Sequence, residues 1–336
     1  MTMRFWTRIL TASLLAAALG TASDVHAADK VRVGMLKPNV VTVIYWIAVK
    51  TGSFEKNGLE VEEHPFPSGQ SVAGIEQMLR GNLDFYIGAG GEVARANSQS
   101  MQAGKPPPLA MMPAGDKGGT NFMMSNKLQG KSFDDLKSQQ LRIGISSPSS
   151  THLILFRSFL KDKGLTTNDL KWQFITVQGE NMVPALLGGQ LDGFMHDALT
   201  ATIALQVKAG FLFMSAHRGD MGETAQNLPN TMITISRSYT AAHPDITHRF
   251  VKAIFDASDA YDKAPVPEQV KMIAEWTRRD PAVVEAMLQI FDPRVPRSDK
   301  PAEAWWQLDG TAMKARGEIL QQMKFDDVFD LSYLKQ

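Results

Sequence analysis

Residues 141–160 read LRIGISSPSSTHLILFRSFL, and their pattern changes at the cluster of serines. Residues 141–145 alternate around apolar positions, which predicts a buried strand, and Pro148 with its serine neighbours ends it. From Thr151 onward apolar side chains recur at helical spacing, behind hydroxyl residues that can cap a helix. Such a helix N-terminus suits an anion, because free backbone N–H groups and the helix dipole favour negative charge. A capped helix of any α/β protein has the same pattern, so this stretch alone leaves both interpretations open.

The same plan occurs twice along the chain. Strands are predicted at 31–35, 59–64 and 83–87 and again at 141–145, 172–177 and 191–195, with helices between them at 40–49, 68–81, 152–163 and 182–187. This order predicts parallel sheets with right-handed crossovers. The turns also match: NGL at 57–59 corresponds to KGL at 163–165, SGQ at 68–70 to QGE at 178–180, and RGNLDF at 80–85 to GGQLDG at 188–193. One unit present twice predicts two similar α/β lobes.

The remaining segments complete this architecture. Further strands are predicted at 211–215 and 231–236, and the glycine-rich residues 112–124 carry the chain from the first lobe to the second. From Pro244 onward the pattern is helical, and this tail is expected to pack on the first lobe. The predicted domains are a first lobe of 28–116 and 226–336 with the C-terminal helical tail, and a second lobe of 117–225, joined by a two-segment hinge.

The first 27 residues have the pattern of a secretory signal peptide. Arg4 and Arg8 precede an apolar stretch at 9–19, and small residues follow up to Ala27, after which cleavage is expected. The apolar core is too short to span a bilayer, so no membrane insertion of the mature chain is expected. The chain has no cysteine, which excludes disulfides, thiolate metal sites and a lipoprotein anchor. These features predict a periplasmic protein that is not a lipoprotein.

Charge excludes two classes of partner. The chain has 35 Lys and Arg against 35 Asp and Glu, with no long run of one sign. Neither nucleic acid nor a membrane surface is therefore an expected partner.

The predicted ligand site lies where the two lobes face each other. In parallel open sheets ligands bind outside the carboxyl ends of the strands, because loops and helix N-termini converge there. Two lobes can bring two such edges together. The candidate ligand-binding residues in the loops at these edges are Lys37, Gly69, Gly90, Gly91, Glu92, Ser147, Ser149, Ser150, Thr151, Gln178, His196 and Asp197.

Several of these residues also have structural interpretations. Lys37 either pairs with an anionic ligand or is solvated. Glu92 and Asp197 either bind an ammonium group or act as helix caps or interlobe contacts. A catalytic dyad of His196 and Asp197 is rejected, because neighbours on a strand point to opposite faces and no motif supplies a nucleophile. His152 is assigned to local hydrogen bonding, since no second histidine lies at metal-ligand spacing.

Two aromatic residues of the first predicted helix are ambiguous in the same way. Tyr45 and Trp46 lie where this helix leaves the predicted site, and their rings could stack on a ligand. An amphipathic helix also needs such side chains on its core face, and we favour that interpretation.

Three motifs together resemble a known family. They are GISSPSSTHL at 144–153 followed by Gly164-Leu165, GGQLD at 188–192, and GNLD at 81–84 followed by Gly90. In this order, behind a signal peptide, they look like the periplasmic substrate-binding proteins of ABC importers for aliphatic sulfonates, taurine and nitrate, which are related to the binding proteins for thiamine-pyrimidine precursors. The resemblance covers nearly all of the mature chain. Two departures are visible: MHDA at 195–198 stands where the family commonly has Trp-Asp-Pro, and Glu92 where it often has Asp.

The resemblance implies a type II periplasmic binding protein, with two α/β lobes and a hinge. It implies that Ser147, Ser149, Ser150 and Thr151 form an anion-binding loop and that 90–92 form the facing loop of the first lobe. It also implies delivery of the captured solute to the transmembrane subunits of a permease.

The predicted function is that of a monomeric binding protein for a small organic anion with a sulfonate or carboxylate group. It is not expected to be an enzyme, and no catalytic residue, metal or cofactor is assigned. The alternative is an enzyme or a ligand sensor on the same fold that acts on or reports a pyrimidine-type vitamin precursor. Enzymes among the relatives would need iron-binding cysteines and histidines, and this chain has no cysteine.

Overall fold

The computed structural model describes residues 27–37, 40–67, 70–88, 90–117, 119–146, 148, 150–290, 292–294 and 298–335. The predicted signal peptide, apart from Ala27, lies outside these residues. None of the described helices is long and apolar enough to cross a membrane.

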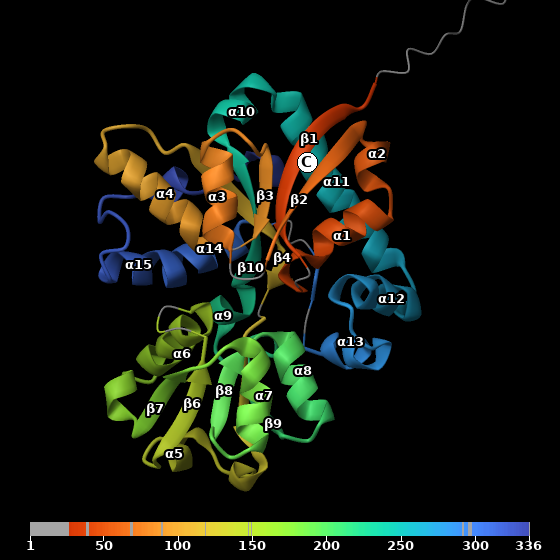
Figure 1. Cartoon of the computed structure of the whole chain (residues 1–336). Helices are drawn as coiled ribbons and strands as arrows, with labels where there is room; N and C mark the ends of the chain where they lie inside the picture. The colour runs from red at the N-terminus through yellow and green to blue at the C-terminus, as the bar shows by residue number, and fades with distance from the viewer. Residues whose placement is uncertain are drawn as a thin grey trace, which may run out of the picture.

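Two five-stranded sheets organise the molecule (Figure 1). The first has the order β2-β1-β3-β10-β4 and consists of β1 (Asp29–Leu36), β2 (Leu59–Phe66), β3 (Phe85–Gly88), β4 (Leu109–Lys117) and β10 (Pro229–Ser236). The second has the order β7-β6-β8-β5-β9 and consists of β5 (Asn121–Ser125), β6 (Leu141–Ile145), β7 (Trp172–Thr176), β8 (Gly193–His196) and β9 (Gly210–Ser215). In each sheet one strand, β10 or β5, is antiparallel to its neighbours. The predicted fold class of two mostly parallel α/β lobes is confirmed.

The internal repeat is visible in atomic detail. In the first lobe, the Asp84 carboxylate accepts hydrogen bonds from the Arg32 backbone N–H at 2.8 Å and from the Arg32 guanidinium at 2.6 Å (Nη2) and 3.2 Å (Nε). In the second lobe, Asp192 accepts the same three bonds from Arg142, at 2.8, 3.2 and 3.1 Å. The aspartate of each LDF or LDG motif thus ties the start of its strand to the first strand of its own unit.

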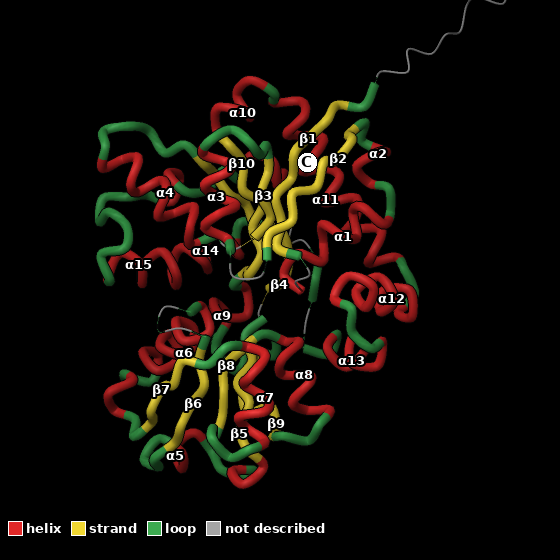
Figure 2. The backbone as a smooth tube through the Cα atoms, in the orientation of Figure 1, coloured by secondary structure: helices red, strands yellow, loops and turns green. Residues whose placement is uncertain are grey.

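Helices cover both faces of each sheet (Figure 2). The first lobe has α1 (Val43–Lys50), α2 (Ser53–Lys56), α3 (Ser71–Leu79) and α4 (Gly91–Gln102), and the second has α5 (Phe133–Leu136), α6 (Thr151–Asp162), α7 (Gly179–Leu187), α8 (Ala198–Gln206) and α9 (Glu223–Asn227). Strand alternation sends side chains into two apolar clusters: Phe85 and Ile87 of β3 belong to one, and Tyr86 belongs to the other.

The C-terminal tail contacts both lobes. It consists of α10 (Arg237–Ala242), α11 (Pro244–Lys263), α12 (Val266–Thr277), α13 (Pro281–Met287), α14 (Lys300–Trp305), a π-helix at Trp306–Gly310 and α15 (Thr311–Ala315). Helices α11 and α12 pack on α1, as expected, but α13 packs on α8 of the second lobe and the π-helix on α6. Both apolar clusters continue between the lobes through this tail, for example at Met287 and Trp305. The tail therefore packs on the first lobe, as expected, and also on the second lobe, which was not expected.

The chain passes between the sheets twice, after β4 and before β10. The glycine-rich segment 112–124 lies largely within β4 and β5 and carries the chain from the first sheet to the second. Gly115 in β4 is required here, because its φ is +125° and a Cβ atom would lie 2.6 Å from the carbonyl oxygen of Pro293.

Candidate functional site

The carboxyl ends of the parallel strands in the two sheets face each other. The passage from β4 to β5 joins these edges directly, because β4 ends beside the start of β10 and β5 begins beside the end of β8 (Figure 2). Helices α4, α6, α7 and α8 begin just after β3, β6, β7 and β8, so their N-termini belong to these edges. Three candidate residues of the same loops, Gly69, Ser147 and Ser149, lie outside the described residues.

The start of α6 is held by contacts of two kinds. The Ser150 hydroxyl caps the helix by accepting the Leu153 N–H at 3.4 Å, in line with the structural interpretation of this serine. The Thr151 hydroxyl instead reaches across to the tail and donates to Asp309 Oδ2 at 3.4 Å. The predicted anion-binding segment therefore contacts a carboxyl group of the first lobe's tail.

Asp309 is a residue of this edge that sequence reasoning missed. It is 6% exposed and belongs to the π-helix of the tail. Its Oδ1 is buried and has no hydrogen-bond partner among the residues that the structure describes. Burial raises the pKa of Asp309 to about 7, although Thr151, Arg316 and Arg95 act in the opposite direction. No local sequence pattern predicts that Asp309 belongs to the site, since its partner Thr151 is 158 positions away in the sequence.

Two histidines lie side by side on the second lobe's edge. The rings of His152 and His196 have centroids 5.2 Å apart. His152 Nδ1 is hydrogen-bonded to the Thr120 hydroxyl at 2.9 Å, and His196 Nδ1 to the Thr200 hydroxyl at 2.7 Å. Burial lowers the pKa of His152 to about 3, with a further contribution from His196, so His152 is neutral. Its predicted role in local hydrogen bonding agrees with these contacts.

His196 and Asp197 are in contact, contrary to the reason given for rejecting a dyad. The strand ends at His196, and Asp197 is the N-cap of α8, where its Oδ1 accepts the Thr200 N–H at 2.8 Å. The carboxylate thereby comes within 3.3 Å of His196 Nδ1. Burial disfavours the charged forms, but their mutual attraction outweighs it, raising the pKa of His196 and holding that of Asp197 well below its usual range.

This pair lacks the geometry of a catalytic triad. The Asp197 carboxylate and the Thr200 hydroxyl both face the same nitrogen of His196, Nδ1. A triad needs the acid on one ring nitrogen and the nucleophile on the other. The arrangement instead favours the protonated, positively charged form of the His196 imidazole, next to the N-terminus of α8.

The neighbouring strands add polar groups at the same edge. Asn121 of β5 pairs with His196 on one side and with Ser215 of β9 on the other. Asn121 Oδ1 and Ser215 Oγ are both buried, and within the described part of the chain neither has a hydrogen-bond partner.

The candidate residues of the first lobe have structural contacts. Lys37 forms an ion pair with Glu63 at 3.0 Å, and its ammonium lies 5.2 Å from the ring centre of Trp276. The Tyr45 hydroxyl donates to the same Glu63 at 3.0 Å from a buried position. Trp46 stacks on Trp276 and donates its indole N–H to a backbone carbonyl. These contacts agree with the core interpretation of both aromatic residues.

The remaining candidates lie at helix starts. Gly90 and Gly91 begin α4, and a Cβ atom on Gly90 would lie 2.7 Å from Met111 Sδ, so the backbone is closely packed there. Glu92 contacts Arg95 of the same helix at 3.4 Å. Gln178 is exposed at the start of α7, next to Gly179, where a Cβ atom would lie 2.7 Å from the His196 ring.

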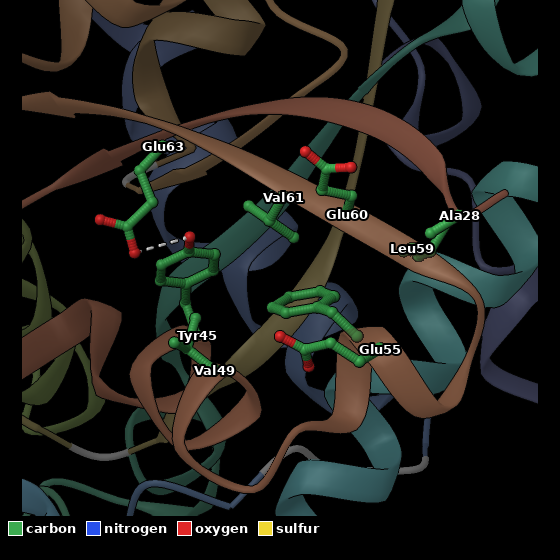
Figure 3. A pocket seen from close by; sticks show the side chains of 9 residues that line it. Ala28, Tyr45, Val49, Glu55, Leu59, Glu60, Val61 and Glu63 are labelled. Atoms are coloured by element: carbon green, nitrogen blue, oxygen red, sulfur yellow. Dashed lines mark hydrogen bonds between the residues drawn. The ribbon is translucent and has the colours of Figure 1, made fainter.

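A separate pocket lies away from these edges. It opens between β2 and the helices α1 and α2 and has a volume of about 420 Å³ (Figure 3). Glu55, Glu60 and Glu63 lie around an apolar wall, and the figure shows Tyr45 donating to Glu63. Most of the β2 residues that line this pocket come from the amino end of that strand, whereas the candidate site lies at the carboxyl ends of the strands.

In the described part of the chain, no group of three or more His, Asp or Glu could hold a metal ion.

Comparison with known proteins identifies the family. Residues 26–278 match the sequence profile of the NMT1-like family. The chain belongs to the NMT1-like family. No curated protein matches its sequence.

Solved structures share the fold of this NMT1-like chain. A putative sulfonate-binding periplasmic protein from Methylobacillus flagellatus is 16% identical with a TM-score of 0.71, and the match covers 92% of this chain and 93% of that one. The aliphatic sulphonate binding protein of Escherichia coli is 14% identical with a TM-score of 0.70, covering 90% and 92%. The nitrate-binding protein of Synechocystis is 14% identical with a TM-score of 0.68, covering 92% and 88%. The fold is that of a two-lobe periplasmic binding protein.

Proposed function

We propose that this protein is the periplasmic solute-binding component of an ABC importer. It captures a small organic anion of the sulfonate or carboxylate type between its lobes and delivers it to the transmembrane subunits of a permease. The NMT1-like family and the structural similarity to binding proteins for sulfonate and nitrate support this proposal. The signal peptide predicted from the sequence supports export.

The observation that carries the proposal is the convergence of helix N-termini from both lobes. Helix α4 starts at the edge of the first sheet, and α6, α7 and α8 start at the edge of the second. Each N-terminus presents backbone N–H groups that have no partner within the helix, some of them capped by Ser150 or Asp197, and the positive end of a helix dipole. Charged hydrogen bonds of this kind contribute about 1.5–3 kcal/mol each, enough to hold a small oxyanion without forming a bond.

We assign the hinge to the two passages between the sheets, after Lys117 and before Pro229. Closure around these passages would bring the two edges together on the ligand, as in other hinged binding proteins. The enzyme alternative is not favoured, since the similar solved structures are binding proteins.

The proposal is tested by thermal unfolding in the presence of ethanesulfonate, taurine, nitrate, propionate and benzoate. At about 100 times its dissociation constant a ligand adds about 2.7 kcal/mol to the stability of the folded protein. We expect at least one sulfonate or carboxylate to raise the melting temperature. Failure of every anion in the panel would contradict the proposal.

The anion-binding loop is tested by the double substitution Ser149→Ala and Ser150→Ala. Each lost hydrogen bond is expected to weaken binding of the anion found in the screen by at least about 1 kcal/mol, or about fivefold. Ser132→Ala is the matched control, because Ser132 caps α5 at an exposed site and its loss costs comparable stability, about 1 kcal/mol. Equal affinity for the double variant and the control, measured by calorimetry, would reject the assignment of this loop.

A further inference from the structure

We propose that the C-terminal tail controls how far the interlobe site opens. The contact of α13 with α8 is the pivot on which the second lobe turns, and the hydrogen bond from Thr151 to Asp309 is the latch that limits this turn. This role rests on the proposed function, because the site that the tail controls is the one that captures the solute. The tail thereby joins the two lobes in addition to the two passages of the chain.

The pivot is an apolar contact between two helices. Helix α13 packs on α8, and Val284 and Met287 of α13 are fully buried. On α8 the small residues Ala198, Ala201 and Ala204 are also fully buried and belong to the same apolar cluster. Residues three positions apart lie on one side of a helix, so these alanines form a smooth face. Small side chains interlock little, and α13 can therefore turn on α8 while the contact stays buried.

The latch is a polar contact between the π-helix Trp306–Gly310 and α6. The π-helix packs on α6, and the Thr151 hydroxyl donates to Asp309 Oδ2 at 3.4 Å. Asp309 is 6% exposed, so little water reaches this bond. A single hydrogen bond contributes little net stability, because water replaces either partner when the bond opens. This bond can therefore break and form again as the lobes move.

The pivot and the latch lie on opposite sides of the second lobe. Figure 1 shows α8 and α13 at the right of this lobe and α6 at its left, below α15. The chain itself passes between the sheets after β4 and before β10. If the second lobe turns about the pivot and these passages, α6 moves away from the π-helix and the latch breaks. Opening of the site therefore releases the latch, and closure forms it again.

The latch acts on the helix that begins at the predicted anion-binding loop. Thr151 is the first residue of α6, and Ser150 caps this helix. An anion bound at this N-terminus and the latch both draw α6 towards the first lobe. With the latch intact, the ligand-free protein is already close to the closed arrangement. Less of the binding free energy of the solute is then used to close the lobes.

Distances between spin labels in the ligand-free protein test the latch, and the chain has no cysteine of its own. Lys161→Cys with Ala315→Cys reports the latch side, between α6 and α15. Gln206→Cys with Glu285→Cys reports the pivot side, between α8 and α13. All four positions are exposed. We expect Thr151→Val, which removes the hydroxyl, to lengthen and broaden the latch-side distances and to leave the pivot-side distances unchanged.

Two further variants are controls for the latch. Thr151→Ser keeps the hydroxyl and should keep the distances of the wild type. Glu223→Gln removes an ion pair to Lys300 that also joins the tail to the second lobe, but these side chains are 75% and 66% exposed. An exposed ion pair contributes little, so this control should change neither distance. Melting curves establish that each variant is folded.

Calorimetry measures the effect of the latch on binding, with the anion of the thermal-unfolding panel that raises the melting temperature most. Asp309→Ala removes the latch from the tail and leaves the predicted anion-binding loop intact. We expect this variant to bind the anion at least about threefold more weakly, because the solute has to close lobes that are further apart. Glu223→Gln should bind the anion as the wild type does.

The outcomes separate the latch from the proposed function. Unchanged latch-side distances in Thr151→Val, or pivot-side distances that lengthen equally, would overturn the roles of the tail and leave the binding function intact. An unchanged affinity in Asp309→Ala would overturn the control of binding by the latch. Failure of every anion in the panel would contradict the proposed function, whereas the label distances, which need no ligand, would still decide whether the latch exists.

Discussion

Replacing Asp84 with alanine is expected to destabilise the protein by about 3 kcal/mol, because it leaves a buried set of donors unpaired. Asp84 is 4% exposed and accepts both the backbone N–H and the guanidinium of Arg32. The guanidinium can partly turn to solvent, since the Arg32 side chain is 38% exposed, which keeps the loss below that of a fully buried ion pair.

The second copy of the unit provides the control. Asp192 makes the same three bonds to Arg142, but its side chain is 30% exposed, so Asp192→Ala should cost about half as much. Urea unfolding of both variants measures the difference. Equal losses, or a loss below about 1 kcal/mol for Asp84→Ala, would show that burial does not set the strength of this bond network.

Asp309→Asn is expected to stabilise the protein at about pH 8 by about 3 kcal/mol and to have little effect near pH 4. Burial raises the pKa of Asp309 from 3.8 to about 7. Between these values the folded protein binds a proton that the unfolded chain has released, so this group lowers stability as the pH rises through the window. Asparagine cannot ionise and therefore removes the loss.

Melting temperatures of the wild type and of Asp309→Asn at about pH 4, 6 and 8 measure this effect. His196, whose raised pKa also makes stability fall with increasing pH, is present in both proteins and cancels in the comparison. A difference between the two proteins that does not change with pH would contradict the ionisation of a buried Asp309.

The fold could be predicted from the sequence because short segments of the chain contain the patterns that specify each strand, turn and helix start. Short apolar strands, turn glycines and helix starts repeat in the same order, and the GNLD and GGQLD motifs mark the two equivalent aspartates. The arginines that these aspartates bind, Arg32 and Arg142, lie 52 and 50 residues away. The motif therefore indicated a turn, but not the hydrogen bonds that the aspartate makes to the first strand of its unit.

The candidate site could be predicted only in part. The helix N-termini were predictable, because a strand end followed by a cap is a local pattern. Asp309 was not, since it reaches α6 through a tail whose path depends on packing against both lobes. The contact between His196 and Asp197 was excluded by a rule for strands that stops applying where the strand ends, at His196.

Small-angle X-ray scattering during titration with taurine or ethanesulfonate tests most directly that the two lobes close around a small anion. The account predicts a smaller radius of gyration at saturation, and no change for the Ser149→Ala, Ser150→Ala variant at the same ligand concentration if that concentration saturates only the wild type. A radius of gyration that stays constant while calorimetry shows the wild type saturated would contradict closure on the ligand.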